Sequence, residues 1–195
     1  MKSLSLNVPD EQAQAFAKEL ATLMKKHGVE VENKEALDAM RPITERVKTF
    51  EDACNELGEE NVLVQAYRTA EFNTSGNQKD VSDVVAYLKL RIIVAALNEG
   101  WQPTFFDDEY RYYPWFVFYT KEELDTMDEE ERSRVLGRSN DNAGAVAGVA
   151  YSYTRFASSS SRPTTGGPLS FKNREMAEYA GQQFLAIYAD FLIGF

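Results

Sequence analysis

The stretches DVSDVVAYLKLRIIVAALNEG (residues 80–100) and YRYYPWFVFY (residues 110–119) decide the fold. In the first, apolar side chains recur at helical spacing until Asn-Glu-Gly ends the pattern, so we expect a central buried helix. The second is rich in aromatic residues, which favours a strand. Pro114 cannot donate a hydrogen bond to a β-ladder, which implies that this strand lies at a sheet edge or carries a bulge.

Capping residues mark four further helices. A side chain that accepts a backbone hydrogen bond stabilises a helix start, and a glycine ends a helix well. Thr120 and Glu123 form a capping-box pattern, which predicts that an acidic helix begins there. The expected helices follow Pro9, Thr49, Thr120 and Asn173, and they end near Gly28, Gly58, Gly137 and residue 192.

Two further strands complete the expected fold. Residues 149–157 alternate in a way that predicts a strand with Tyr151, Tyr153 and Arg155 on one side, and residues 169–172 predict a short strand. The fold class is therefore α+β, with a small, mostly antiparallel sheet packed by several helices and a helical amino-terminal portion.

The chain is expected to form one α+β domain over residues 1–195. A polar loop over residues 73–77 is the best internal boundary. It would divide the domain into a helical region, residues 1–72, and a helix-plus-sheet core, residues 80–195.

The composition excludes several classes of protein. The 195 residues are 44% hydrophobic, which predicts a folded chain. The net charge of −10 argues against a protein that coats duplex DNA, because such binding depends on Lys and Arg neutralising phosphates. There is no signal-peptide pattern, and no apolar run approaches the roughly 20 residues that span a bilayer. We expect a cytoplasmic protein without membrane contact.

Catalytic groups are scarce in this sequence. The single cysteine, Cys54, and the single histidine, His27, exclude an internal disulfide and the common structural zinc sites. His27 suits a helix end and Cys54 suits a buried apolar position. Neither P-loop nor Rossmann glycines occur. We therefore expect no catalytic residue, no metal and no cofactor, so the chain is not expected to be an enzyme.

One alternative to this interpretation is a metal-dependent enzyme. Asp107, Asp108 and Glu109 form a carboxylate cluster of the kind that binds Mg²⁺ or transfers protons. No second cluster supplies further ligands, which favours a solvated turn instead.

Aromatic residues exceed what one core needs. If residues 110–119 form a strand, Tyr113 and Trp115 share a face, and the face opposite the core would expose more aromatic area than a monomer usually does. This predicts a binding surface for a protein partner or a second copy. The alternative is single-stranded nucleic acid or a nucleotide, because bases stack on aromatic rings. Burial of both faces beneath helices is the third outcome. The candidate binding residues are Tyr113, Trp115, Tyr151, Tyr153, Arg155, Arg162 and Lys172.

Five short motifs carry a family resemblance. They are KTFEDAC (residues 48–54), AALNEGWQP (95–103), YYPWF (112–116), LSFK (169–172) and EYAGQQF (178–184). Together they resemble a family of uncharacterised proteins that phages and prophages of gut bacteria carry, over roughly residues 43–192. The resemblance implies a viral origin and the host cytoplasm, and it brings no catalytic residues. The resulting prediction is a non-catalytic binding or interaction protein of phage or prophage origin.

Overall fold

The structure, a computed structural model, forms two compact units, residues 1–46 and 47–195. The first unit contains the predicted helix α1 (Asp10–His27) and the single turn α3 (Ile43–Arg46). The residues described are 9–28, 41–74, 81–137, 148–158 and 166–193. Residues 73 and 74 of the expected boundary loop belong to a helix instead, and its other residues lie outside the described ranges. The interpretation as one domain stays a prediction.

Helix α6 (Ser82–Leu97) is the centre of the second unit. Seven of its residues are buried, which confirms the expected central helix. Helices α4 (Phe50–Leu57) and α5 (Val62–Thr74) pack against it, as does α10 (Leu185–Ile193). Among the described residues, no helix combines the length and the hydrophobicity that crossing a lipid bilayer requires.

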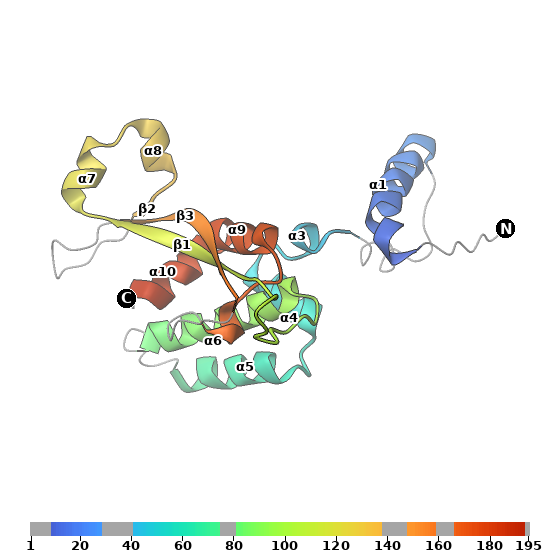
Figure 1. The fold of residues 1–195 in the computed structure, drawn as a ribbon, viewed down its shortest axis with the longest axis horizontal. Coiled ribbons are helices and arrows are strands. Elements are labelled where there is room, and N and C mark those ends of the chain that lie inside the picture. The colour runs from blue at the N-terminus through green and yellow to red at the C-terminus, as the bar shows by residue number, and fades with distance from the viewer. Residues whose placement is uncertain (1–8, 29–40, 75–80, 138–147, 159–165, 194–195) are drawn as a thin grey trace. The chain divides into compact units, whose positions relative to one another are not determined.

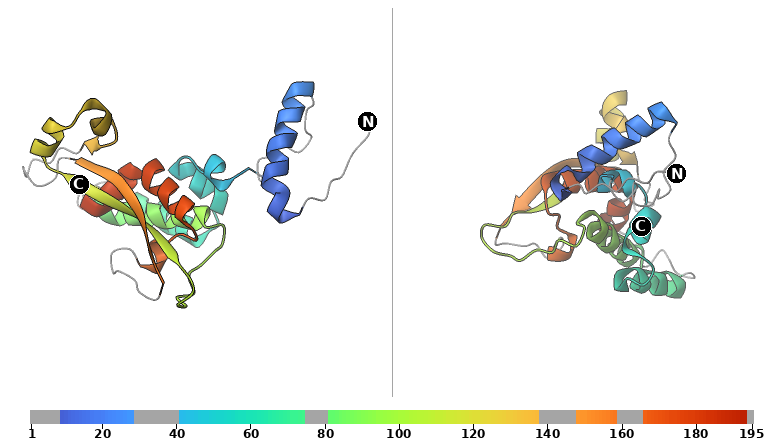
Figure 2. Two further views of the ribbon diagram at one scale, coloured as in Figure 1. Left: turned by 45° about the horizontal axis from the view of Figure 1, so that its top comes forward. Right: turned by 90° about the vertical axis from the view of Figure 1, so that its right-hand side faces the viewer.

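The sheet has three antiparallel strands in the order β1-β3-β2. Strands β1 (Arg111–Tyr119) and β3 (Gly148–Ala157) form a long ribbon, and β2 (Leu136–Gly137) pairs only with the start of β3. Helix α9 (Arg174–Gln183) packs on the ribbon, and layers of helices follow behind it (Figures 1 and 2). This arrangement confirms the α+β fold class.

Two of the expected helices begin at their predicted caps, Thr120 and Asn173, but each is divided in two. The acidic segment forms α7 (Lys121–Thr126) and α8 (Glu129–Ser133), since Met127 is extended and Asp128 accepts a hydrogen bond from Glu131 N–H as a new cap. Phe184 leaves helical geometry and divides the last helix into α9 and α10.

The expected strand over residues 169–172 is also wrong. Its place is taken by the 3₁₀ turn η2 (Gly167–Leu169) and one isolated β-bridge, in which Phe171 pairs with Tyr112. Pro168 lies inside this turn, where its fixed φ angle fits and its missing N–H costs nothing.

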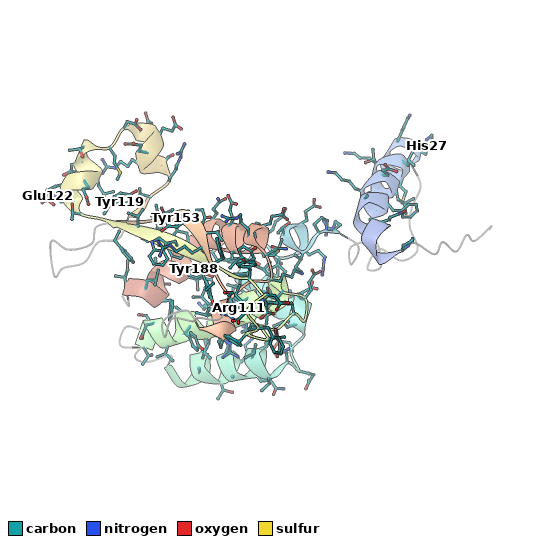
Figure 3. The ribbon with its side chains drawn as sticks, viewed as in Figure 1. His27, Arg111, Tyr119, Glu122, Tyr153 and Tyr188 are labelled. Atoms are coloured by element: carbon teal, nitrogen blue, oxygen red, sulfur yellow. The ribbon has the colours of Figure 1, made fainter. Side chains whose placement is uncertain are left out.

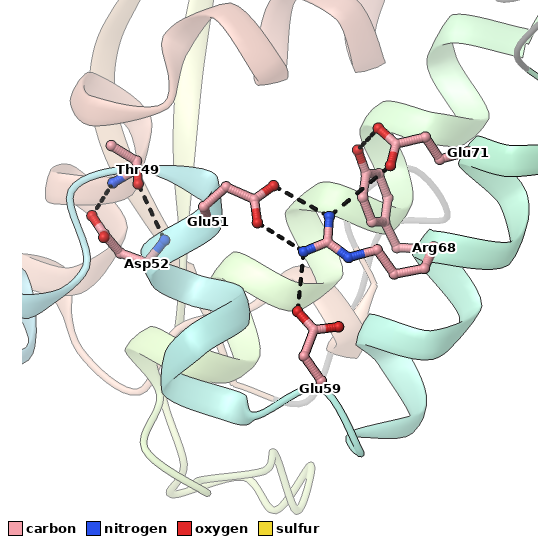
Figure 4. A network of polar contacts seen from close by, with 7 residues as sticks. Thr49, Glu51, Asp52, Glu59, Arg68 and Glu71 are labelled. Carbon is pink, nitrogen blue, oxygen red and sulfur yellow. Dashed lines mark hydrogen bonds and ion pairs between the residues drawn. The ribbon is translucent and has the colours of Figure 1, made fainter.

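A charged network joins α4 to α5. Arg68 donates two hydrogen bonds to Glu51, at 2.7 and 3.2 Å, and one to Glu59 at 3.1 Å (Figure 4). The hydrogen bonds from Arg68 lower the pKa of the Glu51 carboxyl. At the start of α4, Thr49 and Asp52 form the complete capping box. The network therefore joins α4 to α5, and the cap determines where α4 begins.

Cys54 lies on the inner side of α4 and has no exposed surface, which confirms its expected burial. Burial raises the pKa of its thiol from 9.0 to about 11. The folded state therefore holds this proton at pH values where the unfolded chain releases it, and folding stability must fall as the pH rises from about 9 to about 11.

This pH dependence is measurable by denaturant unfolding. We expect the free energy of unfolding to fall more steeply between about pH 8.5 and pH 10.5 in the wild type than in Cys54→Ala, because the variant lacks the titrating thiol. The cavity in the variant lowers stability at every pH and leaves this difference in slope unaffected. Equal slopes would contradict the burial of an un-ionised thiol.

Candidate functional site

Strand β1 lies at the edge of the sheet. Both the N–H and the C=O of Tyr112 bond to Phe171, on the side away from β3. Because backbone groups alternate along an antiparallel strand, those of Pro114 also face away from β3. Proline at this position therefore costs the β1–β3 ladder no hydrogen bond, and the edge position expected from the sequence is confirmed.

A β-bulge in β3 controls which aromatic rings share a face. Trp115 pairs with Tyr153, but the next residue, Phe116, pairs with Tyr151, so Ser152 is an extra residue without a partner on β1. The extra residue moves Tyr151 to the face opposite Tyr153. The expectation that both tyrosines lie on one side of the strand is therefore wrong.

One face of the ribbon is covered by helices. Tyr151 lies so close to α9 that a Cβ on Gly181 would meet its ring carbon at 2.5 Å. The ring of Phe116 contacts that of Tyr188 on α10, with centroids 4.8 Å apart, and Tyr188 is labelled in Figure 3. The Tyr151 hydroxyl is hydrogen-bonded to the Thr154 hydroxyl at 2.9 Å. Tyr151 therefore packs between the sheet and the helices and is not part of an open surface.

The opposite face carries three stacked side chains. The rings of Trp115 and Tyr153 lie with centroids 6.1 Å apart and planes 29° apart. The guanidinium carbon of Arg155 lies 4.3 Å from the centroid of Trp115 and 5.6 Å from that of Tyr153. Tyr153 keeps 42% of its surface exposed. We call Trp115, Tyr153 and Arg155 the Trp115 stack.

Both ends of this face are closed. At one end the ring of Phe105 lies 4.1 Å from the guanidinium of the buried Arg111. At the other end, a Cβ on Gly148 would meet Val135 at 2.6 Å and Leu124 at 3.3 Å. Side chains of residues 121–135, which we call the α7–α8 segment, therefore cover this end. The surface available to a partner is therefore centred on the Trp115 stack.

The remaining predicted residues are not part of the Trp115 stack. Tyr113 shares the face of the Trp115 stack, but only 7% of its surface is exposed. Lys172 forms an ion pair with Glu99 at 2.7 Å. It follows Phe171, which bonds to the edge of β1 away from β3. Arg162 lies outside the described residues.

Several exposed aromatic residues were missing from the predicted site, and two of them contact each other. Tyr110 and Phe156 keep 52% and 57% of their surfaces exposed, and their rings contact edge to face at 5.2 Å. Phe156 pairs with Tyr112 and belongs to the face opposite Arg155. Alternation along residues 149–157 places it on that face, but the sequence gives no sign that helices leave this end uncovered.

One carboxylate of the expected cluster, Glu109, stabilises the loop before it. Glu109 accepts hydrogen bonds from the backbone N–H groups of Thr104 and Phe105, at 2.7 and 2.8 Å. Asp107 and Asp108 are exposed beside it. In the part of the chain that the structure describes, no three His, Cys, Asp or Glu side chains are placed to hold a metal ion together.

Comparisons of the chain with protein-family models, with curated proteins and with solved structures find no match.

Removing the hydroxyl of Tyr113 or of Tyr151 tests whether each forms the hydrogen bonds that the structure shows. Within the described residues the buried Tyr113 hydroxyl has no hydrogen-bond partner, whereas that of Tyr151 has Thr154. We expect Tyr113→Phe to leave the free energy of unfolding unchanged or to raise it, and Tyr151→Phe to lower it by about 1 kcal/mol. Denaturant unfolding measures both. A loss in Tyr113→Phe as large as that in Tyr151→Phe would show that the Tyr113 hydroxyl is bonded in solution.

Proposed function

We propose that this chain is a non-catalytic binding protein of phage or prophage origin that recognises a protein partner through the Trp115 stack. The observation that carries the proposal is the stack of the exposed Tyr153 and Arg155 on the half-buried Trp115, on a face whose two ends are closed. The viral origin and the host cytoplasm depend on the resemblance of residues 43–192.

The composition of the stack favours a protein partner. Trp, Tyr and Arg are the residue types that contribute most to the centres of protein interfaces. Stacking against the indole restricts the guanidinium before binding, which reduces the entropy lost when a partner docks. Within the described residues no carboxylate lies within ion-pair distance of Arg155, so a carboxylate of the partner can pair with it. The expected partner surface is therefore apolar with an acidic residue.

Photocrosslinking in the host cell tests this proposal. A benzophenone amino acid replaces Tyr153 in one variant and Phe106 in the control, because Phe106 is an exposed aromatic residue outside the ribbon. We expect one discrete adduct from position 153 that disappears on adding Arg155→Gln, and none from position 106. An adduct with twice the mass of the chain identifies a second copy as the partner. Equal crosslinking from both positions would contradict the proposal.

A second candidate function is binding of single-stranded nucleic acid or a nucleotide. The observation that favours it is the near-parallel stacking of Trp115 and Tyr153 beside a cation. Bases stack on such rings without regard to sequence, and each stacked base contributes roughly 1–3 kcal/mol. The net charge of −10 opposes this function.

Fluorescence of Trp115 distinguishes the two functions. In Trp101→Phe the only tryptophan left is Trp115. If nucleic acid binds, oligothymidylate quenches this fluorescence at low salt, the quench weakens at high salt, and Arg155→Gln reduces the affinity about tenfold or more. Arg134→Gln is the matched control, because Arg134 belongs to the α7–α8 segment and pairs with Glu130. No quench at low salt would exclude the second function and leave the first intact.

A further inference from the structure

A pocket of about 360 Å³ lies in the second unit, apart from the Trp115 stack. Helices α5 and α6 form one side of it, the loop after α6 forms another, and the 3₁₀ turn η2 forms a third. Its walls are mainly apolar and include Trp101, Pro103, Phe105 and Pro168. A volume near the lower end of the range of ligand sites, roughly 300–1,000 Å³, suits a small molecule with one or two rings.

The aromatic wall of this pocket is held in a strained conformation. Phe105 has a φ angle of +65°, which bulky residues rarely adopt and which costs roughly 1–3 kcal/mol. The Glu109 carboxylate stabilises this strained loop, because it accepts hydrogen bonds from the backbone N–H groups of Thr104 and Phe105. Gly167 allows the ring to pack, since a Cβ there would lie 2.6 Å from its tip. Several separate contacts therefore keep the ring of Phe105 at the wall.

The polar residues that line the pocket are Arg91 of α6, Asn98 directly after α6, and Gln102 in the following loop. Arg91 and Asn98 differ in their partners. The amide of Asn98 is used within the fold, because it donates to Ser170 C=O at 2.9 Å and accepts from Lys172 N–H at 3.1 Å. Among the described residues, the guanidinium of Arg91 donates a hydrogen bond only to the Tyr87 hydroxyl, at 3.5 Å, and lies over the Tyr87 ring. No carboxylate of the described residues lies within ion-pair distance of Arg91, so its charge remains available to a ligand.

We propose that this pocket binds a small planar aromatic carboxylate. Its ring lies between Trp101 and Phe105, and its carboxylate accepts hydrogen bonds from Arg91. Arginine binds a carboxylate through two parallel hydrogen bonds, and such charge-assisted bonds are stronger than neutral ones. A single guanidinium balances the one negative charge of a carboxylate. A doubly charged phosphate would need a second cation, and Arg91 is the only charged residue among the described residues that line the pocket.

The test uses trans-cinnamate as the probe. Cinnamamide, which has the same ring and no charge, is the control for the carboxylate. Trp115→Phe leaves Trp101 as the only tryptophan, so its indole N–H resonance reports on the pocket alone. We expect cinnamate to shift this resonance saturably, and we expect cinnamamide and phenyl phosphate to bind at least tenfold more weakly.

Two variants on the same background locate the site. Arg91→Gln removes the cation, and Ala95→Phe fills the pocket while leaving every charge in place. We expect each to weaken cinnamate binding at least tenfold, and Arg134→Gln, which removes a cation that does not line the pocket, to leave it unchanged. Circular dichroism confirms that each variant is folded.

Four results would overturn the proposal. Three are the absence of a saturable shift at millimolar cinnamate, equal binding of cinnamamide, and unchanged binding in a folded Arg91→Gln or Ala95→Phe. If phenyl phosphate bound more tightly than cinnamate, the pocket would be a phosphate site and the carboxylate assignment would be wrong. None of these results bears on the function proposed for the Trp115 stack, which is tested at other residues.

Discussion

The extra residue Ser152 in β3 is the constraint on which the ribbon depends. Side chains alternate along a strand, so without this bulge Tyr151 and Tyr153 would point to the same side. The bulge instead sends Tyr151 to the helices, where it packs against Gly181, and leaves Tyr153 beside Trp115. A single inserted residue therefore separates the aromatic side chains that stabilise the core from those that remain accessible.

The sequence predicted well those elements whose signals are local. The apolar spacing before Gly100 and the cap at Thr49 each lie within one segment, and the structure contains α6 and α4 at these places. The bulge and the break at Phe184 were missed because packing between segments determines them. Phe184 is buried and keeps its place in the apolar pattern, so the pattern continues unchanged across the break.

The candidate site was predicted in part for the same reason. Trp115, Tyr153 and Arg155 were expected to lie together and they do, because cross-strand pairing follows from two strands that the sequence indicated. The pocket was not predicted, since its walls come from α5, α6, the loop after α6 and η2, which are far apart along the chain. Only the folded chain brings the apolar wall residues to Arg91.

Phe105 connects the two surfaces. Its ring is a wall of the pocket and also lies against Arg111, at the start of β1 and four residues before Trp115. The backbone of Phe105 is strained at positive φ, and it would relax if the groups that stabilise this conformation were changed. These are the Glu109 carboxylate, Gly167, which leaves room for the ring, and the guanidinium of Arg111. The wall of the pocket and the closed end of the ribbon face therefore depend on one strained residue, and loosening it would alter both.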